Sequence, residues 1–144
     1  MFKFRLKSIE RLKEHQERNC QEALGLSLTQ LKEAEAARLL LTNETDRVLT
    51  QYLEYHQGPV SIHKICLAQN YAIHLEEQLA QQQMKVRECQ ANVHEAQLAL
   101  VQAMRDKKIL YKLAEKQLQN YLREETRAEQ GFLDEQATAR RRYY

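Results

Sequence analysis

The chain has 144 residues, so one domain over residues 1–144 is the expected organisation. Gly occurs three times, Pro once and Trp never, and residues that favour helices dominate; this composition predicts long solvated helices rather than a compact globular domain. Basic and acidic side chains nearly balance, 22 against 20, which excludes the strong overall positive charge typical of nucleic-acid-binding proteins.

The N-terminal segment alternates charged and apolar side chains in Phe2-Lys3-Phe4-Arg5-Leu6. It lacks the continuous apolar core of a signal peptide. No run of about 18 apolar residues predicts a membrane span. We therefore expect a cytosolic protein, and the odd number of cysteines (Cys20, Cys66 and Cys89) agrees with reduced thiols.

A first helix is expected over about residues 3–56. Its early pattern of mostly apolar residues takes several successive steps of four, at Ile9, Leu12, Gln16, Cys20, Leu24, Leu28 and Leu31. This spacing predicts a stutter that locally unwinds a coiled coil. The regular spacing then returns, at Ala34, Arg38, Leu41, Thr45, Val48, Tyr52 and Tyr55. Gly25 is expected to be tolerated inside the helix at a cost of about 1 kcal/mol.

A turn is expected at residues 57–60, around Gly58-Pro59. Gly accepts the backbone angles that end a helix, and Pro cannot continue one. Either Pro59 or Ser61 could start the next helix, the latter as an N-cap.

A second helix is expected over about residues 61–138, with steps of three and four throughout. The repeat comprises Ile65, Ala68, Ala72, Leu75, Leu79, Gln82, Val86, Cys89, Val93, Ala96, Leu100, Ala103, Lys107, Leu110, Ala114, Gln117, Tyr121, Glu124 and Ala128. Such a repeat predicts a left-handed supercoil. The apolar pattern weakens after Ala103, and Gly131 is expected to mark fraying of the helix.

The expected fold is all-α, an antiparallel two-helix coiled-coil hairpin. At about 1.5 Å per residue the helices would be roughly 80 Å and 115 Å long, so the second should extend beyond the first by about 25 residues, starting near Lys112. An unpaired helix in water is only marginally stable, so this extension should await a partner. When the two helices are paired antiparallel around this turn, no two cysteines face each other, which argues against a disulfide.

No pattern in the sequence indicates catalysis or a cofactor. The five histidines are scattered, and no motif for a nucleophile, a phosphate-binding loop or a zinc protease is present. His63 and Cys66 share a helix face, but two ligands are too few for structural zinc. We therefore expect neither an enzyme nor a metal site.

Two features could bind a partner. Tyr52, Tyr55 and Tyr71 near the turn either fill the seam where the helices separate or form a docking patch. Both ends of the chain are locally basic, as in Arg140-Arg141-Arg142; they are either solvated or dock onto an acidic protein or the inner membrane surface.

Over nearly its whole length the sequence resembles the FliJ family of flagellar export proteins. The opening Phe2-Lys3-Phe4-Arg5-Leu6 with Ile9 and Leu12 is similar to the start of that family. Further similar features are Tyr52 and Tyr55 before a glycine-containing turn, Tyr71 with Leu75 and Leu79 after it, and segments 103–110, 113–116 and 133–140. The short Gly-Pro turn departs from members that have a longer loop.

The resemblance implies a non-enzymatic central stalk of the type III export ATPase, similar to the gamma-subunit shaft of rotary ATPases. Such a stalk inserts into a FliI-like hexameric ring, promotes its assembly and activity, contacts the export gate FlhA and escorts export chaperones. The implied location is cytoplasmic, peripheral to the inner face of the cell membrane at the flagellar base. The implied process is flagellum assembly, and hence motility and chemotaxis.

The resemblance also implies contact residues. Those facing the ATPase ring would be Phe4, Arg5, Leu6, Arg11, Lys112, Lys116, Arg123 and Arg127. Those facing the export gate would be Tyr52, Tyr55, Tyr71, Leu75, Gln78 and Gln82.

Three alternatives remain open from the sequence. The equivalent stalk of a virulence type III secretion system has the same architecture, and neighbouring genes would distinguish it. A generic coiled-coil tether or cargo chaperone would act as a dimer. A nucleic-acid-binding protein would show salt-dependent retention on DNA.

Overall fold

The structure is a computed structural model that describes residues 2–55, 58 and 61–143. Two helices account for nearly all of them: α1 (Lys7–Tyr55, 49 residues) and α2 (Ile62–Arg142, 81 residues). No strand occurs among the described residues. The all-α expectation is confirmed.

Short local hydrogen bonds set the described helix ends. The Lys7 amide donates to the Phe4 carbonyl (3.3 Å) and the Glu10 amide to that of Leu6 (2.9 Å), so a turn leads into α1. Ser61 directly precedes α2, and its carbonyl accepts the Ile65 amide at 3.2 Å. Ser61 therefore occupies the N-cap position of α2.

The expected turn at Gly58-Pro59 falls mostly outside the described residues. Gly58 is described, as an exposed bend, whereas residues 56–57 and 59–60 are not.

Neither interior glycine interrupts its helix. α1 continues through Gly25 and α2 through Gly131, and a Cβ added at either position would meet no atom within 4 Å. The expected fraying at Gly131 is wrong, because the residues after it retain helical structure to Arg142. Three arginines in the last turn stabilise the C-terminal end of α2, because positive charge there complements the helix dipole.

Both helices contribute to two compact units. Unit 2 comprises Cys20–Leu100, and unit 1 comprises Met1–Asn19 together with Val101–Tyr144.

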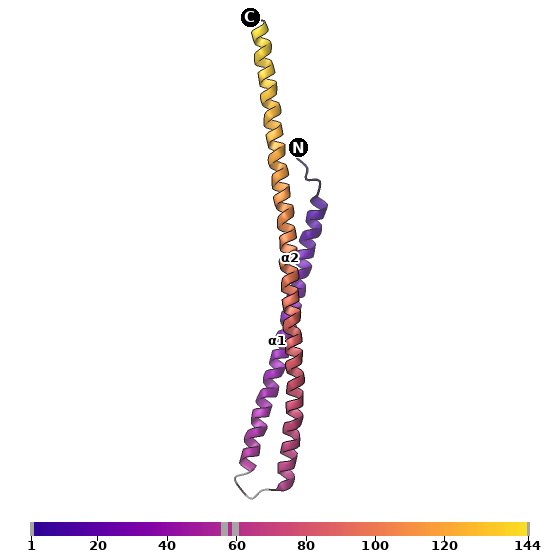
Figure 1. Ribbon diagram of the computed structural model, residues 1–144, viewed down its shortest axis with the longest axis vertical. Coiled ribbons are helices and arrows are strands. Elements are labelled where there is room, and N and C mark those ends of the chain that lie inside the picture. The colour runs from indigo at the N-terminus through magenta and orange to yellow at the C-terminus, as the bar shows by residue number, and fades with distance from the viewer. Residues whose placement is uncertain (1, 56–57, 59–60, 144) are drawn as a thin grey trace. The chain divides into compact units, whose positions relative to one another are not determined.

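In unit 2 the helices run antiparallel, side by side (Figure 1). Two hydrogen bonds give the register: the Tyr71 hydroxyl donates to Glu44 Oε1 (3.1 Å), and Gln82 Nε2 donates to the Ala34 carbonyl (3.0 Å). Every expected heptad position of α2 from Ile65 to Leu100 is at least half-buried. The most buried apolar side chains of this unit are Val48, Leu75, Val86 and Val93. The seam predicted for α2 is confirmed here.

In unit 1 the seam of α2 continues at Ala103, Lys107, Leu110, Ala114, Gln117 and Tyr121, all buried or half-buried. The Phe2 ring lies 5.5 Å, centroid to centroid, from that of Tyr121. From residue 122 to residue 143 every side chain is exposed. The unpaired extension exists, but it begins after Tyr121 rather than near Lys112, because the N-terminal segment before α1 also packs on α2.

The stutter expected in α1 is wrong. In unit 1 the regularly spaced half-buried positions of α1 are Glu10, Lys13 and Glu17 (Glu14, beside Lys13, is half-buried as well), whereas Ile9, Leu12 and Gln16 are exposed. In unit 2 they include Cys20, Leu24, Ser27, Leu31 and Ala34, whereas Leu28 is 46% exposed. These positions alternate steps of three and four without a break. Polar side chains hold several places that the apolar pattern assigned to their neighbours.

Further along α1 most expected positions hold. Leu41, Thr45, Val48 and Tyr52 are at least half-buried, but Arg38 is exposed and Ala37 takes its place. Tyr55 is 38% exposed. The three cysteines are free thiols.

Candidate interaction surfaces

The seam of unit 1 is polar on its α1 side and is joined by ion pairs. Lys107 Nζ lies 2.9 Å from Glu17 Oε2, and Lys13 Nζ lies 3.7 Å from Asp106 Oδ2. Lys107 Nζ also lies 5.3 Å from the centre of the Tyr111 ring, within cation–π range. The hydrogen bond to Glu17, opposed in part by burial, raises the pKa of Lys107. These contacts fix the register of α1 against α2 in this unit.

Tyr111 makes a second link across unit 1. Its hydroxyl donates to Glu14 Oε1 at 2.6 Å. This bond, followed by burial and the Glu14 charge, raises the pKa of Tyr111. The neutral phenol is therefore the form that the fold favours.

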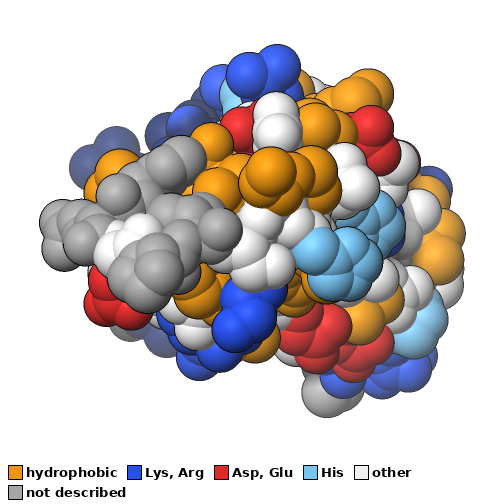
Figure 2. Space-filling view, turned by 90° about the horizontal axis from the view of Figure 1, so that it is seen from below, with side chains coloured by type: hydrophobic (Ala, Val, Ile, Leu, Met, Phe, Trp, Pro, Cys, Tyr) orange, Lys and Arg blue, Asp and Glu red, His pale blue; other side chains and the backbone are white. Residues whose placement is uncertain are grey.

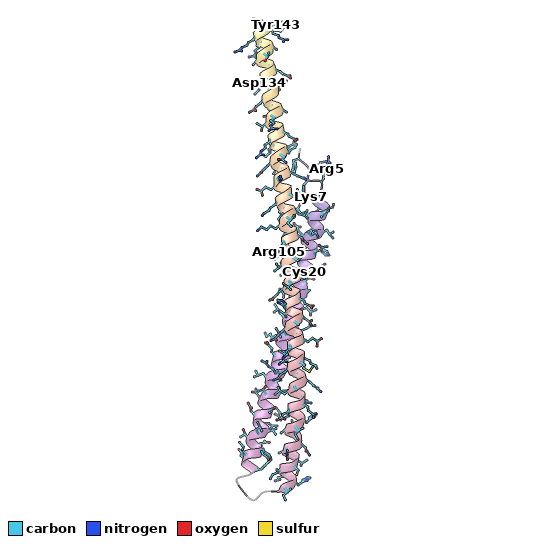
Figure 3. The ribbon with its side chains drawn as sticks, viewed as in Figure 1. Arg5, Lys7, Cys20, Arg105, Asp134 and Tyr143 are labelled. Atoms are coloured by element: carbon cyan, nitrogen blue, oxygen red, sulfur yellow. The ribbon has the colours of Figure 1, made fainter. Side chains whose placement is uncertain are left out.

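All eight residues expected to contact an ATPase ring lie in unit 1. Phe4 and Leu6 are half-buried, and Arg5, Arg11, Lys112, Lys116, Arg123 and Arg127 are exposed. At 3.6 residues per turn, Lys112, Lys116, Arg123 and Arg127 fall within a sector of about 60° on α2. We call these four residues the basic face of α2. Arg105 lies in the same sector, and Figure 3 labels it.

The extension of α2 beyond residue 121 is covered by nothing else in unit 1. Figure 3 shows Asp134 and Tyr143 on this part of the helix, with no second helix of the unit alongside. Its large apolar side chains are half or more exposed: Leu122 (51%), Phe132 (61%) and Leu133 (61%). The extension is therefore accessible to a partner on every side of the helix.

The six residues expected to contact the export gate lie in unit 2, but they divide between seam and surface. Leu75 is 2% exposed and belongs to the core, and Gln82 is half-buried with its amide bonded to Ala34. Tyr52 is half-buried. Tyr55, Tyr71 and Gln78 are exposed and can reach a partner directly.

A charged cluster holds Tyr71 in place. Arg47 bonds Glu44 through two nitrogens, with Nε 3.0 Å from Oε2, and Tyr71 donates to the same carboxylate. The bond to Arg47 is the largest cause that lowers the pKa of Glu44. The bond to Glu44 in turn raises the pKa of Tyr71. The ring of Tyr71, 44% exposed, is thus presented in a fixed position.

Figure 2 shows the end of unit 2 where α1 finishes and α2 begins. Hydrophobic side chains are interspersed there with histidines and charged side chains. The exposed large hydrophobic residues near this end include Leu53 (63%), Ile62 (79%) and Leu67 (56%).

Glu10, Lys13 and Glu17 are seam residues that the apolar pattern does not predict. A signal was present: extending the regular spacing backwards from Cys20 passes through Glu17, Lys13 and Glu10 in turn.

Within the described part of the chain, no three His, Cys, Asp or Glu side chains lie close enough to hold a metal ion. Nor is any described helix apolar over a length that would cross a bilayer.

Two long helices paired through a heptad seam define the class of the protein: an antiparallel two-helix coiled coil that exposes charged and aromatic side chains. The family model described as "Flagellar FliJ protein" matches residues 2–143. The chain belongs to the FliJ family, and this membership assigns it to flagellar type III protein export.

A solved structure has a similar fold. It is that of a putative YscO homolog from Chlamydia trachomatis, with a TM-score of 0.51 and 20% sequence identity. The match covers 96% of this chain and 94% of that chain. At this identity the likeness concerns the fold alone. No curated protein matches the chain.

Proposed function

We propose that the protein is the central stalk of the flagellar export ATPase. It has no chemistry of its own and acts by inserting unit 1 into the hexameric ring, which promotes ring assembly and turnover. The observation that carries this proposal is the bare extension of α2, whose side chains are exposed from residue 122 to residue 143. A single helix of this kind is marginally stable in water and gains most when a partner encloses it.

The basic face supports the same proposal. Lys112, Lys116, Arg123 and Arg127 are exposed, and no ion pair with a described residue neutralises them. An aligned row of cations favours a partner lined by acidic side chains, and steers the encounter with it. The ring-facing residues of α1 (Phe4, Arg5, Leu6 and Arg11) lie in the same unit and would extend this surface.

The experiment adds the purified chain to the cognate FliI-like ATPase and measures hexamer formation and ATP turnover. Both should rise. Arg123→Glu with Arg127→Glu should weaken the effect. If each reversed contact is worth about 0.7 kcal/mol, roughly tenfold more of the variant chain should be needed for the same stimulation. The matched control is Lys85→Glu with Arg87→Glu, two exposed positions of α2 in unit 2. No change on adding the wild-type chain, with both proteins folded, would refute the stalk function.

We further propose that the exposed gate-facing residues Tyr55, Tyr71 and Gln78 contact the export gate protein FlhA. Tyr52, Leu75 and Gln82 would support them from the seam. The fixed ring of Tyr71 is a suitable anchor, because tyrosines are enriched among residues that dominate binding energy.

Two further roles complete the proposal. The chain would escort export chaperones, which predicts that chaperones free of cargo are retained on the tagged chain in a pull-down; their absence would contradict it.

The chain would act in the cytoplasm against the inner face of the membrane at the flagellar base. Loss of the gene should therefore abolish flagella, and with them motility and chemotaxis.

A further inference from the structure

In unit 1, α2 carries a second regular stripe besides the seam. Its steps alternate three and four, at Val101, Met104, Lys108, Tyr111, Glu115, Leu118 and Leu122. At 3.6 residues per turn the stripe is centred about 110° around the helix from the seam. Its five apolar side chains are 40–51% exposed. A helix with two such faces is built to pack against two neighbours, and α1 covers only one of them.

A groove runs beside one end of the stripe. It has a volume of about 400 Å³. Its lining comprises Glu17 from α1 and six residues of α2: Val101, Met104, Arg105, Lys107, Lys108 and Tyr111. The Glu17 carboxylate is already paired with Lys107. The apolar side chains of Val101 and Met104, the Tyr111 ring and the aliphatic stems of the basic residues therefore line a groove with no unpaired acidic group, and it suits an apolar side chain from another helix.

The stripe reads the same in both directions. Counted outwards from Tyr111, each side has positions at three or four, seven, and ten or eleven residues. An antiparallel second copy centred on Tyr111 would place Leu122 opposite Val101 and Leu118 opposite Met104. The leucines of one chain would then enter the groove of the other. Self-complementarity of this kind is what a two-fold symmetric interface requires.

The two charges that interrupt the stripe fit the same arrangement. Lys108 of one copy would face Glu115 of the other, and the pair would occur twice. Within the described residues neither side chain forms an ion pair of its own. A charged pair that is unsatisfied within one chain and matched between two chains specifies both orientation and register.

We infer that the free protein forms a reversible antiparallel dimer through the stripe from Val101 to Leu122. Because each of the five apolar side chains leaves about half of its surface exposed, pairing buries on the order of 1,000 Å² over both chains, in the range of weak, reversible interfaces. The dimer belongs to the chain before it meets its partners, so it goes beyond the stalk function. The basic face lies about 100° from the stripe and takes no part in it.

The experiment measures sedimentation of the isolated full chain over a dilution series. The wild-type chain should pass from dimer to monomer in the micromolar range. Lys108→Glu and Glu115→Lys, each alone, place like charges opposite each other twice and should raise the dissociation constant about tenfold or more. The two single variants mixed together should pair as tightly as wild type, because every contact in the mixed dimer is again between opposite charges. The double variant Lys108→Glu/Glu115→Lys should also dimerise.

Lys116→Glu is the matched control, since it makes the same change one position from Glu115 but outside the stripe. It should leave the dissociation constant unchanged. Circular dichroism checks that every variant keeps its helices. A wild-type chain that stays monomeric, single variants that dimerise as wild type, or a mixture that fails to recover would each overturn the inference. None of these readouts involves the ATPase, so failure here is distinguishable from failure of the stalk function.

Discussion

At the scale of single residues, polar side chains decide the packing of unit 1. Glu17 is only 13% exposed, although it sits where an apolar residue would be the simpler choice. It is accommodated because Lys107 neutralises it and because Lys107 lies over the Tyr111 ring. Ion pairs of this kind contribute less to stability than to the choice of register, which is the best-attested role of polar groups in a coiled-coil seam.

The Tyr111–Glu14 bond makes unit 1 sensitive to alkaline pH. The fold raises the pKa of Tyr111, so its stabilising contribution is complete below the unfolded value of about 10 and is lost as pH rises through the folded value. Glu14→Gln removes the carboxylate and should return the titration of Tyr111 towards its ordinary value. Nuclear magnetic resonance of labelled tyrosine rings measures this directly. An unchanged midpoint in the variant would show that Glu14 does not hold the phenol.

At the scale of elements, the sequence predicted α2 better than α1. The seam of α2 was predictable to Tyr121, because small and aliphatic residues mark most of its positions. In α1 the same criterion selected Ile9 and Leu12 over Glu10 and Lys13, since apolarity alone cannot tell that a partner will neutralise a buried charge. The extension began later than expected for a related reason: packing of the irregular segment at Phe2 depends on contacts that periodicity does not encode.

The candidate contact residues show the same limit. Their division between the two units follows from their order in the chain and could be anticipated. That Leu75 and Gln82 are seam residues also follows from the heptad, which includes both. The cluster that fixes Tyr71, however, depends on the exact register between Glu44 and α2, which the sequence pattern leaves open by a turn in either direction.

Gly25 offers a test of helix stability in α1. Its replacement by Ala meets no atom within 4 Å, so only the intrinsic preference changes. Gly25→Ala should stabilise the protein by about 1 kcal/mol, measured as a higher midpoint of urea unfolding. Gly131→Ala is the matched comparison in the unpaired extension. It should increase helical circular dichroism without moving the main unfolding transition, and equal shifts from both variants would contradict the description of residues 122–143 as an unpaired helix.

At the scale of the whole molecule, the two units present different chemistry on the same pair of helices. Unit 1 offers a row of basic side chains and a bare helix. Unit 2 offers tyrosines near the end where α1 finishes. Both helices pass without a break through both units. That the chain unfolds as one domain stays a prediction, and a single transition seen by probes in each unit would support it.

If unit 1 binds the ATPase and unit 2 binds FlhA, as proposed, binding to each partner can be lost separately. Tyr71→Ala with Gln78→Ala removes exposed side chains of unit 2 and should weaken binding to FlhA by roughly tenfold or more, as expected for an aromatic anchor. Stimulation of the ATPase should persist. Arg123→Glu with Arg127→Glu should weaken stimulation of the ATPase and leave binding to FlhA unchanged. Leu75→Ala separates surface effects from unfolding, because truncating this core residue costs about 2–5 kcal/mol and should lower the unfolding midpoint. If each surface pair impaired both partners equally in folded variants, the two units would not be separate docking surfaces.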